Sequence, residues 1–423
     1  MELFPGCHKT ELDNGMRVIV EEIPSSNSVS VGMWFNSGSR DEPEEVNGIT
    51  HLIEHLIFRG TKNRSADEIS AAVDRLGGRI IGGTGREYMV VYLDLLPETV
   101  SQGLKLLSDL ALNPLFKAQD LNLEKKIVSE EIRSKHDDPQ WSVLKAFEEA
   151  LWGEHGLAKP IAGNEDSILK LNSRGLKERF DFMKAPENVA ISAAGNLKAE
   201  SFFEKVREYF HDLRGRNGTK DRPSPIPKNS GHVRVERDIK QTHFCIGGRG
   251  LENNNSDKYV LEMLKVILGG GMSSRLFRKV RKEEGLAYNI SSNTEYYSDA
   301  GTFFVYSATD KPKLEKLSRL ITKEFRDFRN QTPSEDELSL AKKKTKGNLV
   351  LGLESNQAHM VRLGSSLVYE IELDPVEKVL NRIDAVTGKD IRRIARKLLD
   401  EEKLSWAVLG PEASGIELPF LRS

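Results

Sequence analysis

Apolar positions along the chain follow two different periods, and this pattern predicts a mixture of strands and helices. Short segments rich in β-branched and aromatic residues predict buried strands, at 29–36, 86–96 and 301–308. Apolar residues spaced three and four apart predict helices at 97–111, 119–136, 141–151, 199–210, 257–268 and 311–328. Several strands are hairpin-like neighbours. The pattern therefore predicts an α+β fold in which a mainly antiparallel mixed sheet carries helices on one face.

The clearest interruption of this pattern is the segment 214–231. It is rich in Pro, Gly, Ser, Asn and charge, and it has no apolar period, which is typical of a linker. The chain therefore divides into predicted domains 1–213 and 232–423.

The two predicted domains share a layout of strands. The strand containing Arg17 resembles the strand containing Arg234, and these residues are 217 positions apart. A late apolar strand that ends at Gly195 resembles one that ends at Gly410, 215 positions further on. Because the two offsets nearly agree, the sequence predicts two copies of one α+β unit joined by the linker.

Composition narrows the classes of protein that fit. The 423 residues include 62 Lys and Arg against 64 Asp and Glu, so the net charge is −2. A chain this close to neutral has no overall basic field, which argues against a dedicated nucleic-acid binder. No run of 18 apolar residues occurs, so we expect no transmembrane helix.

The cysteines and the N-terminus bear on location. Cys7 and Cys245 form neither a CxxC motif nor a disulfide framework, which fits a reducing compartment. The first residues lack the basic and apolar regions of a secretory signal. We therefore expect a cytoplasmic protein with neither a membrane nor a nucleic acid as partner.

The most informative segment has the sequence NGITHLIEHLIFRG. Asn47 is predicted to cap the N-terminus of a helix, and Gly60 to follow its end. His51 and His55 are four residues apart, so both imidazoles lie on one helix face and reach a single ion. Glu54 lies on nearly the same face, close to such an ion without having to ligate it.

The rest of this helix is apolar almost all round, which predicts that it is buried. Two histidines and a carboxylate are costly to desolvate in such a place unless they have partners. The structural alternative is a pair of core histidines bonded to backbone carbonyls. The spacing HxxEH on a helix favours an inverted zinc motif, with His51 and His55 as ligands.

A catalytic zinc site also needs a third protein ligand and an open position for water. Helical spacing places Glu124 and Glu131 on the apolar, inward face of the helix at 119–136, with Glu130 to one side. We predict Glu131 as the third ligand. Glu124 is predicted to be a carboxylate behind the ligands or a weak alternative ligand. A salt-bridged pair of acids under the helix is the alternative interpretation.

This set of residues predicts metal-assisted hydrolysis of a peptide bond. Zinc lowers the pKa of a bound water to about 7 and polarises a carbonyl. Glu54 then acts as general base and passes the proton to the leaving amine. A purely structural zinc site would need a fourth ligand, for which His136 and His155 are the nearest unassigned histidines.

These motifs resemble the pitrilysin (M16) family of zinc peptidases over nearly the whole chain. HLIEHLIFRGT matches the family's inverted zinc motif, and Glu131 stands 76 residues after His55, which is the family's spacing for the third ligand. Glu124, seven residues earlier, matches a further family glutamate. WGEHGLAKPIAGNEDSI, APENVAISAAGN and LGGGMSSRLFRKVRKEEGLAY resemble other family segments.

The resemblance implies two homologous α+β domains, one Zn²⁺ per chain and peptide substrates. It implies that Arg281 and Tyr288 contact the substrate near the scissile bond and take part in catalysis, as do Glu54 and Glu124. A guanidinium binds a carbonyl through two N–H groups, and a phenol donates to a developing oxyanion, so both residue types suit this role.

One departure from the family concerns the strand that follows Gly77-Gly78, where family members dock the substrate as an added β-strand. The family usually has Asn-Ala there, and this chain has Ile81-Gly82. Ile81 offers no amide side chain to a substrate. Backbone pairing at Gly82 and Gly83 is expected to remain, because neither residue has a side chain that blocks close approach.

The resemblance also implies that two chains enclose a chamber that admits short or unfolded peptides. We expect a homodimer, with a heterodimer of related chains as the alternative. The alternative function is a non-catalytic subunit of the same fold, either a scaffold or the substrate-binding half of a heterodimer. The intact set of His51, Glu54, His55 and Glu131 favours the enzyme.

Overall fold

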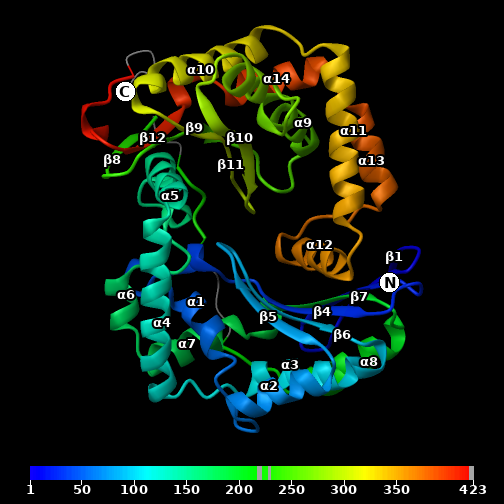
Figure 1. Cartoon of the computed structure of the whole chain (residues 1–423). Helices are drawn as coiled ribbons and strands as arrows, with labels where there is room; N and C mark the ends of the chain where they lie inside the picture. Colours follow the sequence, from blue (N-terminus) through cyan, green and yellow to red (C-terminus); the bar gives the residue numbers. More distant parts are fainter. Residues whose placement is uncertain (217–221, 227–229, 419–423) are drawn as a thin grey trace. The chain divides into compact units, whose positions relative to one another are not determined.

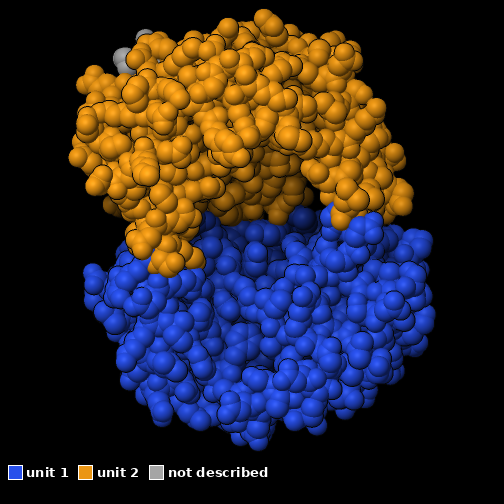
Figure 2. All heavy atoms as spheres, in the orientation of Figure 1, with its two compact units in different colours: residues 1–133, 159–222, 352–373 blue, residues 134–158, 223–351, 374–423 orange. Residues whose placement is uncertain are grey.

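The computed structural model describes residues 1–216, 222–226 and 230–418, and these residues form two compact units. Unit 1 contains residues 1–133, 159–222 and 352–373, and unit 2 contains residues 134–158, 223–351 and 374–423 (Figure 2). Neither unit is continuous in sequence, because each includes a segment from the other half of the chain.

Unit 1 is built on a seven-stranded sheet with the order β1-β2-β3-β7-β4-β6-β5. The strands are β1 (Glu2–Phe4), β2 (Cys7–Glu11), β3 (Arg17–Glu22), β4 (Val29–Phe35), β5 (Arg79–Thr84), β6 (Met89–Leu95) and β7 (Val189–Gly195). Only β3 and β7 pair in parallel, and β5 lies at one edge of the sheet.

The helices of unit 1 cover both faces of this sheet. They are α1 (Ile49–Leu56), α2 (Ala66–Arg75), α3 (Val100–Leu112), α4 (Ala118–Asp137, which contributes to both units), α6 (Glu165–Lys170), α7 (Ser173–Met183), α8 (Ala199–Phe210) and α12 (Asn356–Val368). Alternate residues of β4, such as Val31 and Met33, pack in the main core with residues of α1, α3 and α8. Trp34, the residue after Met33, faces the opposite side of the sheet.

Helix α12 covers that opposite face, although it comes from the C-terminal half of the chain (Figure 1). The Trp34 indole donates to Ser192 Oγ at 2.8 Å, and Ser192 Oγ donates to the Met360 carbonyl at 2.9 Å. Gly364 lies directly against the Trp34 ring, so that a Cβ on Gly364 would overlap the ring. The helix and the sheet therefore approach each other more closely than a residue with a side chain at position 364 would permit.

We expect Gly364→Ala to destabilise unit 1 by about 1–3 kcal/mol, since the added methyl overpacks a site where the indole is held by its hydrogen bond. The matched control is Gly175→Ala on α7, where a Cβ meets nothing closer than 3.8 Å. Urea unfolding monitored by tryptophan fluorescence compares the two variants. Equal stability of both variants and the parent would contradict the close packing of α12.

Unit 2 has a five-stranded sheet with the order β10-β11-β9-β12-β8. The strands are β8 (His232–Glu236), β9 (Thr242–Arg249), β10 (Ala287–Tyr296), β11 (Gly301–Thr309) and β12 (Ser405–Gly410). The helices are α5 (Pro139–Trp152), α9 (Lys258–Gly269), α10 (Leu314–Asn330), α11 (Glu335–Gly352), α13 (Val376–Ala385) and α14 (Gly388–Leu398). Helix α5, from the N-terminal half, packs on the face of the sheet that carries Phe304 and Tyr306.

The two sheets repeat one arrangement of strands. The series β3-β7-β4-β6-β5 of unit 1 corresponds to β8-β12-β9-β11-β10 of unit 2, and in each series only the first pair is parallel. The strands matched in sequence, those with Arg17 and Arg234 and those with Gly195 and Gly410, occupy equivalent places. The predicted α+β class with two mixed sheets is confirmed.

The predicted elements are observed, but several helices, among them α12, α13 and α14, have no counterpart in the sequence predictions. Each predicted strand and helix has an observed counterpart, with ends shifted by a few residues. The expectation of helices on one face only is wrong, because α12 and α5 cover the second face of each sheet. Of the predicted linker, residues 217–221 and 227–229 lie outside the described residues, and the domain limits stay a prediction. Among the described helices, none is long and apolar enough to cross a membrane.

Candidate metal centre and active site

Helix α1 carries the HxxEH motif and is anchored in the core of unit 1. Ile49, Leu52, Ile53 and Leu56 are buried, which fixes the apolar side of the helix. Its N-cap is Gly48, which has φ 93° and offers no side chain. The prediction that Asn47 caps the helix is therefore wrong. The Asn47 side chain instead donates to Glu42 Oε2 at 3.0 Å and to the Pro160 carbonyl at 3.1 Å.

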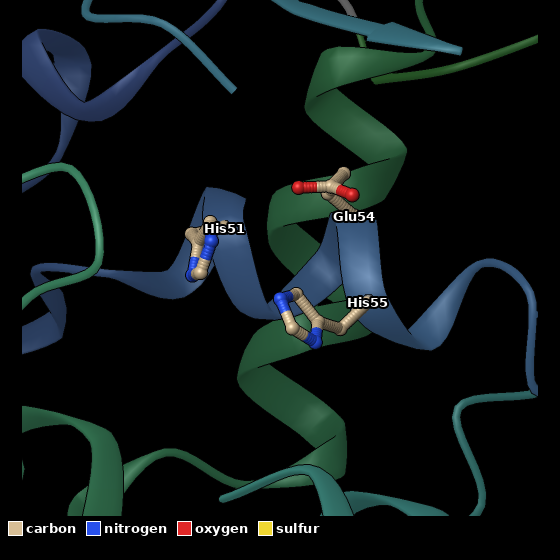
Figure 3. A group of neighbouring side chains, drawn as sticks. All are labelled: His51, Glu54 and His55. Atoms are coloured by element: carbon tan, nitrogen blue, oxygen red, sulfur yellow. The ribbon is translucent and has the colours of Figure 1, made fainter. Parts of the chain in front are cut away.

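His51, Glu54 and His55 project from α1 as a group (Figure 3). Each of them offers a ligand atom, and these atoms all lie within 4.8 Å of one another. The two imidazole centroids are 4.7 Å apart, with an angle of 63° between the rings. The helical spacing thus brings the three side chains together as the sequence indicates.

Glu131 on α4 faces the two histidines. Its Oε2 atom lies 3.7 Å from His51 Nε2 and 3.8 Å from His55 Nε2. Two ligand atoms that are each about 2.0–2.2 Å from one tetrahedral zinc ion lie roughly 3.3–3.5 Å apart. The observed separations exceed this by only a few tenths of an ångström, so Glu131 Oε2 is placed to share a zinc ion with either imidazole nitrogen.

Glu124 precedes Glu131 by seven residues, which is about two turns of α4, and it lies behind His55. Its Oε2 atom is 2.9 Å from His55 Nδ1, and its Oε1 atom accepts a hydrogen bond from Arg59 Nε. A carboxylate held in this way favours the His55 tautomer with its proton on Nδ1, in which Nε2, the atom nearer Glu131, is the one free to bind a metal.

Burial and the neighbouring charges have opposite effects on the pKa values of His55 and Glu124. Burial alone lowers the pKa of His55, but the hydrogen bond to Glu124 and the charge of Glu54 outweigh it and raise that pKa. Burial alone raises the pKa of Glu124, but its bonds to His55 and Arg59 lower it below the usual range. Glu124 is therefore held as a carboxylate.

Glu54 stands between α1 and the edge strand β5. Burial raises the pKa of the Glu54 carboxyl above its usual range, although nearby His55 and a hydrogen bond from Thr84 oppose this. Thr84 Oγ1 donates to Glu54 Oε2 at 3.3 Å. A Cβ on Gly82 would overlap Glu54 Oε1, so the carboxylate fills the space that a side chain would otherwise take.

Successive residues of β5 point to opposite faces of the sheet. Gly82 and Thr84 share the face that meets Glu54. Ile81 packs on the other face, in the cluster of Trp34 and α12. The Ile81 side chain thus takes part in the attachment of α12.

Arg281 and Tyr288 belong to unit 2 and lie next to each other. The Arg281 guanidinium is 4.2 Å from the centroid of the Tyr288 ring and 4.8 Å from that of Phe277, which is within range for cation–π attraction. Tyr288 is 76% exposed. Arg281 lies in a π-helical segment, Phe277–Glu283.

His136 and His155 have other partners. His136 packs edge-on against Trp141 with the ring centroids 5.2 Å apart. His155 Nε2 is 2.9 Å from the Pro223 carbonyl oxygen, and its Nδ1 accepts from the Leu157 amide at 3.2 Å. Neither His136 nor His155 belongs to the group of His51, Glu54 and His55 whose ligand atoms lie close together.

Three residues around the site are absent from the sequence predictions: Glu42, Arg59 and Thr84. Arg59 follows His55 by four residues, and this spacing could have indicated it. Thr84 shares the β-strand alternation of Gly82. Glu42 lies in an irregular segment eight residues before Thr50, and no local motif connects the two residues.

Comparisons with known proteins identify the family of this chain. The family model described as Insulinase (Peptidase family M16) matches residues 17–165, and the model described as Peptidase M16 inactive domain matches residues 171–345. The chain is 33% identical over 404 residues to the uncharacterized zinc protease YmxG of Bacillus subtilis, covering 95% of this chain and 97% of that protein. The chain belongs to the M16 peptidase family.

Two further comparisons extend over almost the whole chain. The uncharacterized zinc protease Rv2782c of Mycobacterium tuberculosis is 34% identical over 424 residues, covering 97% of this chain and 94% of that protein. The crystal structure of a protease from Helicobacter pylori superposes with a TM-score of 0.90 at 20% identity and covers 96% of this chain and 99% of that one. This structure supports the fold, and the relatives supply the link to zinc proteases.

Proposed function

We propose that this chain is a zinc-dependent endopeptidase that hydrolyses short or unfolded peptides. The observation that carries the proposal is the approach of Glu131 to both histidine Nε2 atoms, with Glu54 alongside them at the edge strand. Two nitrogens and one oxygen leave a fourth position open in a tetrahedral site, as catalytic zinc requires.

His51, His55 and Glu131 would hold the zinc ion. When bound, zinc polarises a peptide carbonyl and lowers the pKa of a water molecule to about 7. Arg59 and Glu124 keep the Nδ1 proton of His55 in place, so that Nε2 remains a ligand atom. Glu124 thereby acts through His55 rather than as a ligand.

Glu54 would act as the general base. The pKa of its carboxyl is raised in the direction of neutral pH. A base with such a pKa can accept a proton in one step and return it in the next. Thr84 donates to Oε2, which leaves Oε1 to take the proton of the attacking water and deliver it to the leaving amine.

The peptide would bind along the edge of β5. This strand pairs only with β6 in the described sheet, so its other edge offers backbone groups at Gly82 and Gly83 for an added strand. Arg281, which is partly buried, lies against the ring of the exposed Tyr288, and the two would bind the substrate backbone near the scissile bond. The roles of Arg281 and Tyr288 rest on the family resemblance.

One zinc ion per chain is part of the proposal. In unit 2, α9 and β10 occupy the places that α1 and β5 occupy in unit 1. There Glu262 pairs with Lys265 and accepts from Thr294 Oγ1 at 2.8 Å and Tyr296 Oη at 2.7 Å. A carboxylate neutralised in this way is a poor metal ligand.

We further propose a homodimer that encloses the site, and a cytoplasmic location.

The proposal predicts that removal of zinc abolishes peptide cleavage. The purified chain is incubated with a mixture of unstructured peptides, before and after treatment with a chelator, and the products are identified by mass spectrometry. We expect cleavage by the zinc-loaded protein, loss of cleavage after chelation, and recovery when one equivalent of zinc is returned. A zinc-loaded protein that cuts none of the peptides would contradict the proposal and favour the non-catalytic subunit.

A further inference from the structure

We propose that Glu42 is the positioning residue of the metal helix, because it holds the N-terminus of α1 from outside the helix. Glu42 Oε2 accepts from the Gly48 amide at 2.7 Å, and Oε1 accepts from the Thr50 amide at 2.8 Å. Oε2 also accepts from Asn47 Nδ2 at 3.0 Å. One carboxylate thus takes up two of the first backbone N–H groups of α1, which the helix cannot satisfy itself.

The anchor is buried and enclosed by other parts of unit 1. Glu42 is only 3% exposed. The charge of Arg179, on α7, offsets part of the cost of burying the carboxylate. Arg179 is itself held by a 2.8 Å bond from Nη2 to Ser37 Oγ. Lys159 Nζ donates to the Glu42 carbonyl at 2.9 Å, so the Glu42 backbone is fixed as well.

Helix α1 depends on this outside carboxylate because it has no cap of its own. Gly48 cannot supply a side chain, and a Cβ there would overlap the backbone of Ala162 and the side chain of Ile168. A negative group at the N-terminus also interacts favourably with the helix dipole. The helix is only eight residues long, so a bond at its N-terminus adds substantially to the buried apolar contacts that hold it in place.

The link to the metal site is short. Thr50, whose amide is bound to Glu42, immediately precedes His51. His51 Nε2 must keep its place relative to Glu131 for the ligands to share an ion. A shift of the first turn of α1 therefore moves His51 away from the other ligands before it affects the rest of the unit. This inference rests on the proposed zinc site.

The test compares Glu42→Gln with Glu42→Asp. Gln has the same shape but no charge, and only one of its terminal atoms accepts hydrogen bonds, so one backbone amide of α1 loses its partner. Asp keeps the charge but is one methylene shorter. The matched control is Glu45→Gln, the same change at an exposed position three residues away.

We expect Glu42→Gln to weaken zinc binding about tenfold or more, judged by competition with a chromophoric chelator. Its cobalt-substituted form is expected to have a changed visible absorption spectrum. Glu42→Asp should lie between Glu42→Gln and the parent, and Glu45→Gln should match the parent. Circular dichroism of each variant shows whether it is folded.

Parental zinc affinity and a parental cobalt spectrum in folded Glu42→Gln would overturn the inference. If Glu42→Gln does not fold, Glu42→Asp decides, because parental affinity and spectrum in that folded variant would equally overturn it. These readouts do not depend on peptide hydrolysis. A parent that binds zinc but cuts no peptide would defeat the proposed function alone, and a parent that binds no zinc would defeat both.

Discussion

Replacing Glu54 by Gln is expected to lower kcat by about 10²–10⁴-fold while zinc binding stays near the parental level. The Glu54 carboxylate lies beside the proposed ligands, and its raised pKa suits it to accept a proton there. Gln has the same size, so Thr84 and Gly82 still enclose it. The loss should therefore lie in the chemical step rather than in folding or metal content.

The measurement is kcat and KM on one peptide identified from the mixture, with zinc content determined for each preparation. Glu54→Asp is the comparison, because it keeps a carboxylate at a shorter reach and should retain part of the activity. A kcat of Glu54→Gln within a few-fold of the parent, at equal zinc content, would show that Glu54 is not the base.

Replacing Glu131 by Gln is expected to weaken zinc binding on the order of 100-fold or more, because a neutral amide is a poor substitute for a carboxylate ligand. Glu131 Oε2 lies within 3.8 Å of both histidine Nε2 atoms. Hydrolysis should fall with the zinc content of the preparation.

The adjacent Glu130 provides the matched control. Its side chain is 73% exposed and pairs with Arg133 at 2.7 Å, so Glu130→Gln removes the same charge from the same turn without reaching the histidines. Isothermal titration with zinc compares the two variants. An equal loss of affinity in both would indicate a general effect of negative charge, and no loss in either would exclude Glu131 as a ligand.

The core of the candidate site followed from local sequence patterns. The i, i+4 spacing of His51 and His55 fixes their common face, and the inward stripe of α4 selects Glu131 over Glu130. The alternation of β4 likewise separates Met33 in the main core from Trp34 on the opposite face. These features repeat within a few residues, and local geometry determines them.

The parts that the sequence did not predict depend on contacts between distant segments. Helix α12 packs on β4 and β7 although more than 150 residues separate it from them, and its periodicity does not say which sheet it covers. Glu42 caps α1 from an irregular segment, so the nearer Asn47 appeared to be the cap. Both cases need the folded chain, because nothing in the local pattern selects the partner.

The central claim is that His51, His55 and Glu131 hold one zinc ion. X-ray absorption at the zinc edge of the loaded parent protein tests it most directly, together with the number of zinc ions per chain. We expect one zinc per chain, bound only by nitrogen and oxygen, with outer scattering from two imidazoles. Sulfur in the coordination sphere, three or more imidazoles, or no stoichiometric zinc would contradict it.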